Sequence, residues 1–266
     1  MGKTPWISRL VIATVVVAAV VGSIVLFNRD GESPAAATHG DGLIETHDGF
    51  NLEPVTLPQK RGESTPVAFR IRDKHNRPLT QYDEHRGRRL HLYVVRDDMH
   101  AYQHLEPKLD GEVWRAAITV PDGGQYRLYA EFVPRVSVET VHPILLGVPF
   151  VVPGDTTFEP LPEPAASVTV DGVTVTRVGG IAQPKVGRES TLRFTLPGAT
   201  LPGASGGSLT VLHATSLAML DVRSAKAKDG GLAFTTRFAE RGEHRLFVEF
   251  QVDGKRRIAG FTVFAT

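Results

Sequence analysis

The hydrophobic residues of this chain are grouped in short runs that end at turn-forming residues. Examples are LHLYVV at 90–95, YRLYAEF at 126–132 and HRLFVEF at 244–250, and Asp-Gly pairs at 110–111 and 253–254 are typical turns. Runs of this length and spacing are typical of the strands of a β-sandwich, and they do not follow the period of about 3.6 residues of an amphipathic helix. The pattern predicts a mainly β protein.

The two halves of the chain resemble each other. The matching blocks are GESTPVAF (62–69) with GRESTLRF (187–194) and GQYRLYAEF (124–132) with GEHRLFVEF (242–250). The length changes fall between the blocks, where loops accept insertions and deletions. We therefore predict two tandem immunoglobulin-like β-sandwich domains, at residues 48–152 and 167–266. Four prolines in PGDTTFEPLPEPAA (153–166) predict an extended, semi-rigid linker between them.

The N-terminus predicts a membrane anchor. Residues 10–27 are an uncharged apolar run of 18 residues, which as a helix would span about 27 Å of the roughly 30 Å hydrocarbon core. Lys3 and Arg9 precede it, so the positive-inside rule places residues 1–9 in the cytoplasm and the rest of the chain outside. The polar residues 28–47 then predict a flexible tether. We expect a single-pass plasma-membrane protein with extracytoplasmic C-terminal domains.

A cleavable signal peptide is the competing interpretation of this terminus. Ala35-Ala36-Ala37 offers small residues of the type that precede a cleavage site. The apolar run is longer than a usual signal core, however, and the alanines do not follow it directly. An uncleaved signal anchor is the favoured interpretation.

Composition and motifs exclude several classes of function. The chain of 266 residues has 30 Lys and Arg against 29 Asp and Glu, a formal net charge of +1 and no cysteine. It lacks the basic excess of a nucleic-acid-binding protein, and it can form neither a disulfide nor a thiol nucleophile. The sequence motifs of serine hydrolases, P-loop proteins, dinucleotide-binding proteins and zinc proteases do not occur in it. We predict a non-enzyme that does not bind nucleic acid.

Histidines and carboxylates gather in the first half of the chain, in LHLYVVRDDMHAYQHLEP (90–107) and just before it. The candidate metal-binding residues are His85, His91, Asp98, His104 and Glu106. At a constant offset of 117 residues, the second half has Ser208, Asp221 and Arg223 in place of His91, His104 and Glu106. The second half thus keeps the scaffold but not the candidate ligands, as expected if a metal site had been lost there.

Two interpretations of these residues stay open. His104 and Glu106 lie on one face of a strand because successive residues of a strand alternate between faces. With His91, and with His85 or Asp98, they offer the mixed nitrogen and oxygen ligands that suit Zn or Cu(II). Alternatively, these side chains form a structural network, in which His91 bonds a loop carbonyl and His104 pairs with Asp98. A role in partner recognition is a third possibility.

Several segments also resemble a known group of proteins. LHLYVVRDDMHAYQHLEP, the upstream QYDEH, GQYRLYAEF and RLFVEFQVDGKRRIAGFTV are similar to a family of actinobacterial membrane-anchored envelope proteins, mostly uncharacterised and often labelled heavy-metal-binding or copper-associated. The family pattern has HL, then an Asp, then QH-x-HP; His91, Asp98 and His104 match it, and Glu106 replaces its last histidine.

The resemblance implies a membrane-anchored envelope module that binds Cu or Zn through its first sandwich. The second unit departs from the family pattern, with Ser208-Leu209 and the segment 221–224 in place of the histidine motifs. The alternative is a structural or protein-interaction ectodomain without a metal site, with another envelope protein as its partner.

Overall fold

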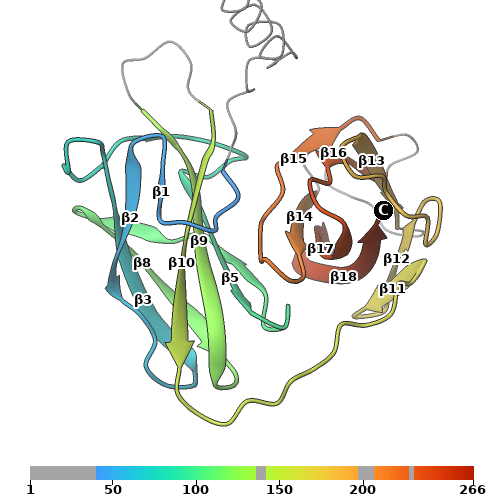
Figure 1. The fold of residues 1–266 in the computed structure, drawn as a ribbon, viewed down its shortest axis with the longest axis horizontal. Helices are drawn as coiled ribbons and strands as arrows, with labels where there is room; N and C mark the ends of the chain where they lie inside the picture. Colours follow the sequence, from blue (N-terminus) through green and yellow to red (C-terminus); the bar gives the residue numbers. More distant parts are fainter. Residues whose placement is uncertain (1–39, 136–141, 197–206, 228–230) are drawn as a thin grey trace, which may run out of the picture. The chain divides into compact units, whose positions relative to one another are not determined.

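The computed structural model describes residues 40–135, 142–196, 207–227 and 231–266. These residues form β-strands and loops without a helix, which confirms the predicted mainly β fold (Figure 1). The predicted membrane span at 10–27 lies outside the described residues. Within the described ranges, no helix has the length and apolar character that crossing a membrane requires.

Each half of the chain forms one sandwich. The strands of the first are β1 (Thr46–His47), β2 (Phe50–Thr56), β3 (Gly62–Arg72), β4 (Tyr82–Asp83), β5 (Leu90–Arg96), β6 (Gln103–Leu105), β7 (Lys108–Asp110), β8 (Val113–Val120), β9 (Gly124–Pro134) and β10 (Ile144–Val152). The strands of the second are β11 (Ser167–Val170), β12 (Val173–Arg177), β13 (Glu189–Thr195), β14 (Gly207–His213), β15 (Val222–Ala225), β16 (Leu232–Arg237), β17 (Gly242–Val252) and β18 (Lys255–Ala265).

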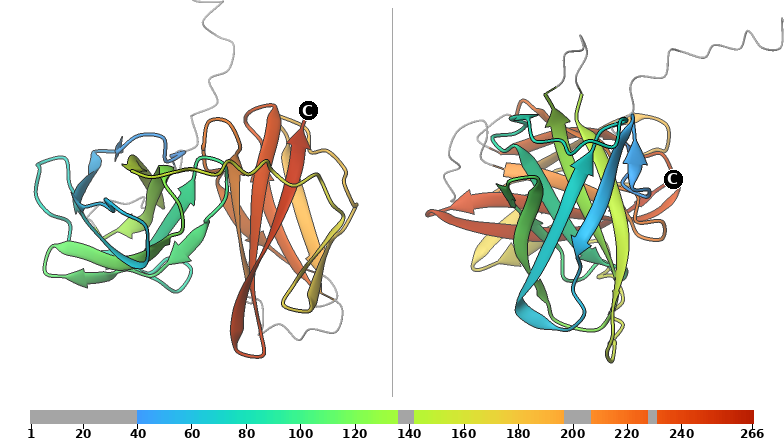
Figure 2. Two further views of the ribbon diagram at one scale, coloured as in Figure 1. Left: turned by 90° about the horizontal axis from the view of Figure 1, so that it is seen from below. Right: turned by 90° about the vertical axis from the view of Figure 1, so that its left-hand side faces the viewer.

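The sheet order contains that of an immunoglobulin constant-type sandwich, with one further strand on the five-stranded layer of each sandwich and β6 added beside β5 in the first. In the first sandwich the two layers have the orders β1-β2-β3-β8-β7 and β10-β9-β5-β6, with β4 paired to β9. In the second they are β11-β12-β13-β16-β15 and β14-β17-β18 (Figure 2). One sheet of each sandwich thus holds the equivalents of strands A, B, E and D, and the other holds C, F and G.

The pairing register confirms the duplication. Val94 on β5 pairs with Gln103 on β6. In the second sandwich the backbone N–H of Leu220 donates to the Val211 carbonyl. These two pairs are equivalent at the offset of 117 residues. The sequence blocks therefore correspond to the same structural positions, and not only to similar composition.

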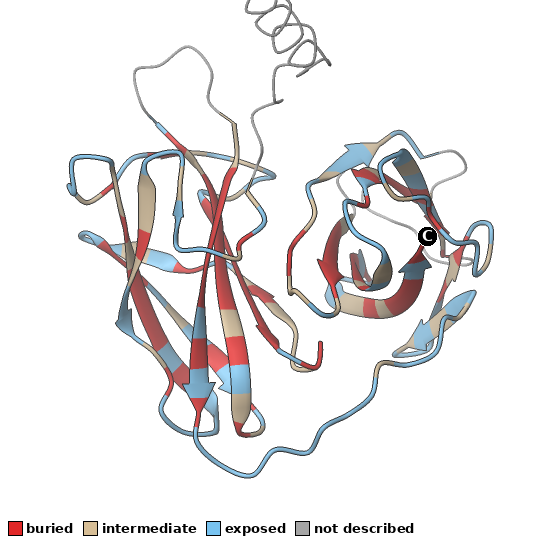
Figure 3. Ribbon diagram, viewed as in Figure 1, coloured by how far each residue is buried: buried red, intermediate tan, exposed pale blue. Residues whose placement is uncertain are grey.

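Each sandwich has its own apolar core, and a third apolar cluster joins the two. It contains Tyr93, Val95, Met99, Tyr129 and Leu145 from the first sandwich and Leu212, Met219 and Phe247 from the second. For this reason β5 is buried at all seven of its residues and lacks the alternation of a strand that faces water (Figure 3).

The start of the described chain packs at this junction. The Asp41 carbonyl accepts a hydrogen bond from the backbone of Met219 in the second sandwich, and the Ile44 carbonyl accepts one from Gly147 on β10, at 2.9 and 3.0 Å. A Cβ atom on Gly147 would lie 2.0 Å from the Gly42 carbonyl oxygen, so only glycine permits this approach. Residues 41–44, which fall within the predicted tether, are bound to both sandwiches.

Candidate functional site

Two of the candidate histidines meet in a buried hydrogen-bonded chain. The pairing of β5 with β6 places His104 opposite Tyr93, and the two rings stack with centroids 4.3 Å apart. His91 Nδ1 lies 2.8 Å from His104 Nε2, and His91 Nε2 lies 2.8 Å from the backbone oxygen of His85. His104 Nδ1 lies 2.8 Å from Glu249 Oε1 on β17. We call this chain of contacts, from His85 O to Glu249, the histidine relay.

Both ring nitrogens of His91 and of His104 have a partner within the relay. Burial lowers the pKa of His91 to about 3 and also lowers the pKa of His104. The His85 carbonyl can only accept, so His91 Nε2 donates to it. His91 Nδ1 faces His104 Nε2, and His104 Nδ1 faces Glu249.

Glu249 gathers donors from both sandwiches. The Tyr102 hydroxyl donates to Oε1 at 2.9 Å, and Arg256 pairs with Oε2. Burial would raise the pKa of Glu249, but the hydrogen bond and the charge of His104, the charge of Arg256 and the Tyr102 hydroxyl lower it overall. Its repeat equivalent in the first sandwich is Glu131, which accepts from the Tyr93 hydroxyl at 2.8 Å.

The two sandwiches make equivalent contacts with each other at the junction, as the two subunits of a symmetric dimer do. Tyr102 of the first sandwich stacks on Phe247 of β17, with ring centroids 3.9 Å apart. Tyr129 of β9, the repeat equivalent of Phe247, donates a hydrogen bond to the Leu217 carbonyl of the second sandwich at 2.6 Å. Equivalent strands thus receive equivalent segments of the other sandwich, which is the pattern of an isologous two-fold interface.

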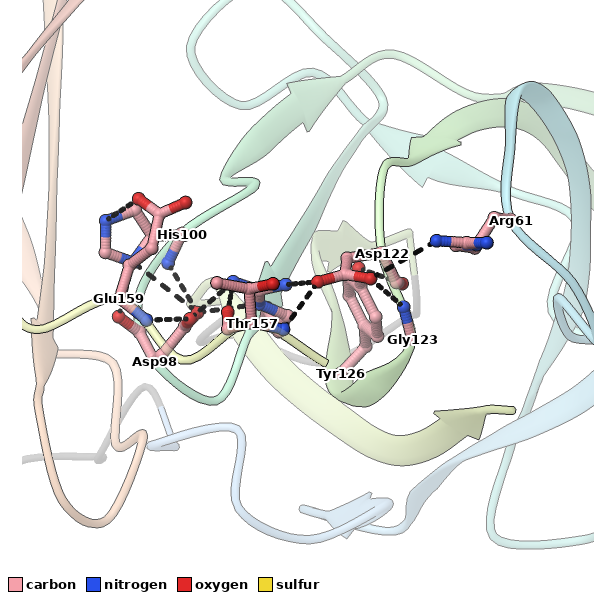
Figure 4. A network of polar contacts seen from close by, with 9 residues as sticks. Arg61, Asp98, His100, Asp122, Gly123, Tyr126, Thr157 and Glu159 are labelled. Carbon is pink, nitrogen blue, oxygen red and sulfur yellow. Dashed lines mark hydrogen bonds and ion pairs between the residues drawn. The ribbon is translucent and has the colours of Figure 1, made fainter. Parts of the chain in front are cut away.

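Asp98 belongs to a different network, at one end of the first sandwich (Figure 4). Arg96 holds both oxygens of Asp98, at 2.9 and 2.5 Å, and also contacts Asp122 at 3.2 Å. The side chains of Arg96 and Asp98 are 4% and 2% exposed. Burial would raise the pKa of Asp98, but the hydrogen bonds from Arg96 and from the His100 backbone lower it.

This network holds the proline-rich linker. The backbone N–H of Thr157 donates to Asp122 at 2.8 Å, and Arg96 donates to the Thr157 carbonyl at 3.0 Å. The backbone N–H of Glu159 donates to Asp98 at 3.4 Å, and the Glu159 carboxylate lies 3.3 Å from His100 Nε2 (Figure 4). The first part of the linker is therefore bound to the first sandwich. We call Arg96, Asp98 and Asp122 the linker clamp.

The structure brings together only part of the predicted site. His85, His91 and His104 lie together, and the His85 ring also lies 3.4 Å from Glu131. Asp98 is in the linker clamp, and Glu106 has an exposed side chain 3.6 Å from Arg88. The bond of His91 to a loop carbonyl agrees with the structural interpretation, but His104 pairs with Glu249 and not with Asp98.

The residues present do not fit a metal ion. No three or more His, Asp or Glu side chains of the described ranges are grouped so that they could hold one. The ring nitrogens of His91 and His104 are all engaged within the relay. The sequence motif therefore marks a hydrogen-bonded relay in this structure.

Sequence reasoning missed Glu249, Tyr102 and Arg96. Glu249 is 145 residues from His104 along the chain, and a single sequence does not indicate which strands of two domains meet. One signal was available in the GQYRLYAEF and GEHRLFVEF blocks. Both have a glutamate between apolar residues of a strand, and a carboxylate at such a position needs buried partners.

Two histidines of the second sandwich lie at positions equivalent to Arg96 of the linker clamp and to its neighbour Tyr126. His213 is the repeat equivalent of Arg96, and His244 is that of Tyr126. The His244 ring is fully buried, donates from Nδ1 to the Gly242 carbonyl at 3.1 Å, and has no hydrogen-bond partner at Nε2. Burial lowers its pKa to about 4. This ring is neutral in the folded protein at pH 7.

We predict that stability falls as the pH drops below about 6.5, in part through His244. The unfolded chain binds this proton at a higher pH than the folded one, so the free energy of unfolding rises with pH between the two pKa values. The variant His244→Phe should reduce this slope by up to about 1.4 kcal/mol per pH unit between pH 6 and 4.5. Urea unfolding at several pH values measures it. An unchanged slope would show that His244 does not titrate in this way.

The chain is similar to proteins grouped in one sequence family. The family model is described as "Domain of unknown function (DUF8832)", and it matches residues 45–145 and 168–266. The chain belongs to this family. The first matched segment runs from the start of the first sandwich to the beginning of β10, and the second covers the second sandwich. No curated protein matches the chain.

Solved structures with a similar arrangement of strands are distant. The Lin-41 filamin domain is 17% identical, with a TM-score of 0.29, and the match covers 35% of this chain and 91% of that one. Invasin, a bacterial integrin-binding protein, is 14% identical with a TM-score of 0.26, and the match covers 82% of this chain and 38% of invasin. The protein SGBP-B of Bacteroides ovatus, solved with a mixed-linkage heptasaccharide, is 14% identical with a TM-score of 0.23, covering 83% of this chain and 48% of SGBP-B.

Proposed function

We propose that this DUF8832 protein is a membrane-anchored binding module of the cell envelope, whose two sandwiches act as one rigid interaction unit without a metal. The anchor is the predicted span at residues 10–27, with Lys3 and Arg9 on its cytoplasmic side. The expected partner is another envelope protein. Such a module acts by binding, so it needs a fixed shape and an exposed surface but no reaction centre.

The histidine relay is the observation that supports this proposal. It starts at the His85 carbonyl in the first sandwich and ends at Glu249 in the second, and its side chains are buried. A buried polar network is stable only while every member keeps its partner, because a buried polar group without one is costly. The relay therefore favours one arrangement of the two sandwiches, and the histidines have a purpose other than metal coordination.

Titration of the intact chain with Cu(II) or Zn(II) near pH 7 should show no binding that depends on His104. Its ring nitrogens are engaged by His91 and Glu249, and an imidazole must offer a free lone pair to coordinate. Calorimetry of the variant His104→Asn should give the same heats as the wild type, although the variant melts at a lower temperature.

The matched control is His75→Asn, which changes an exposed histidine of a turn. Metal binding in the wild type and in His75→Asn that is lost in His104→Asn would contradict the proposal. In that case the resemblance to metal-binding envelope proteins would extend to function.

A further inference from the structure

Phe158 is an exposed aromatic residue on a fixed backbone. It is 74% exposed, more than any other large hydrophobic residue of the described ranges. The residues on both sides of it are held by the linker clamp. Asp122 and Arg96 bind the N–H and the carbonyl of Thr157, and Asp98 accepts from the N–H of Glu159.

The need to hold the linker does not by itself explain an aromatic residue at position 158. The clamp contacts the backbone of Thr157 and Glu159, so it would hold the linker equally well with a polar residue at position 158. Arg96 and Asp98 form a buried ion pair, and taking both charges out of water is costly. Fixing the backbone that carries an aromatic residue lowers the entropy lost on association, and aromatic residues are frequent anchors of protein interfaces.

The charge of the linker indicates the kind of partner. The linker, residues 153–166, contains Asp155, Glu159 and Glu163 and no Lys or Arg. All three acidic residues are exposed. An apolar pocket bordered by Lys or Arg side chains would bury the ring and pair with these carboxylates. An anionic lipid surface would instead repel them, which favours a protein over a bilayer.

One more exposed apolar residue lies at the end of β10, just before the linker. Val151 on β10 is 61% exposed and pairs with Gln125 of β9. The preceding residue of β9, Gly124, lies against the linker: a Cβ there would be 3.3 Å from the Thr156 side chain. This end of the sandwich and the linker thus form one surface.

We propose that Phe158 and the flanking carboxylates are a recognition surface for a protein with an apolar pocket bordered by basic residues. This surface rests on the proposed function, because it names the part of the binding module that contacts the partner. Phe158 is the anchor and the linker clamp positions it.

The test uses the full-length chain in the cells that make it, with the photoreactive residue p-benzoylphenylalanine at position 158. The matched control carries it at Phe264, on β18, which is 40% exposed. We expect a crosslinked protein from position 158 and none from position 264. The crosslinked protein, once identified and purified, should bind the full chain about tenfold more weakly when Phe158→Ala is present, whereas Phe264→Ala has no effect.

Two further measurements separate recognition from a structural role. Raising the salt concentration should weaken binding, because exposed opposite charges are screened. The variant Thr157→Pro keeps Phe158 but removes the N–H that Asp122 accepts. It should weaken binding several-fold while circular dichroism shows the same β fold.

The proposal is overturned if position 158 gives no crosslink, if both positions give the same one, or if Phe158→Ala leaves the affinity unchanged. Binding of the chain to anionic phosphatidylglycerol vesicles that is lost in Phe158→Ala would also overturn it, in favour of lipid. Crosslinks that arise only from other surface positions would reject this surface and leave the proposed function in place. Metal binding that depends on His104 would reject the proposed function instead.

Discussion

Replacement of Glu249 by alanine is expected to lower the free energy of unfolding by about 3–5 kcal/mol. The change removes the acceptor that Tyr102 and His104 share, so Nδ1 of the buried His104 loses its partner, and it leaves Arg256 unpaired. A buried donor without a partner costs about 1–3 kcal/mol, and the loss of an ionic partner adds to this. Urea unfolding near pH 7 measures the difference.

The matched control is Glu243→Ala, on the same strand β17 but exposed. It should change the stability by no more than about 0.5 kcal/mol. The junction also predicts the number of steps in the unfolding transition. If the relay makes the sandwiches one cooperative unit, the wild type unfolds in one step and Glu249→Ala separates it into two. Equal stabilities of the two variants would show that the relay does not hold the sandwiches together.

The strands and the repeat were predictable because they depend on local patterns. Turn residues and apolar runs mark strands such as β9 and β17, whose sequences match each other along their length. The register of each hairpin follows from alternation within it. The repeat then gives the second sandwich from the first without knowledge of any long-range contact.

The site was only partly predictable because its partners come from distant elements. The bond of His91 to a loop carbonyl is local, with a separation of six residues, and it was among the expectations. The pairing of His104 with Glu249 depends on which faces of two domains meet, and local patterns do not contain this. The sequence did indicate that β5 is covered: residues 92–95 are apolar or aromatic on both faces, and such a strand is buried on both sides.

The linker was predicted from its prolines as an extended spacer, and its binding to the first sandwich was not. Prolines predict an extended backbone, but they do not indicate what the backbone contacts. The groups that hold it, Arg96 and Asp122, are separated from Thr157 by 61 and 35 residues. A charged residue inside the apolar strand β5 was the available signal, because a buried arginine needs partners.

Arg96→Ala should be about as destabilising as the loss of Glu249, with a cost of about 3–5 kcal/mol. The substitution leaves Asp98 with a side chain that is 2% exposed and without its cationic partner. Removal of one member of a buried ion pair costs more than the pair contributes, because the remaining charge stays out of water. Thermal and urea unfolding should both show the loss.

A comparison of three variants tests the cause of this loss. Arg115→Ala breaks a surface ion pair with Asp110, whose side chains are 54% and 74% exposed, and should cost at most about 1 kcal/mol. The double variant Arg96→Met with Asp98→Leu replaces both charges by apolar groups and should recover part of the stability, because no buried charge remains.

The double variant should not recover the binding of the linker, since the donor to Thr157 and the acceptor for Glu159 are both gone. Proteolysis within residues 153–166 would then be faster than in the wild type, and equal cleavage rates would show that the clamp does not hold the linker.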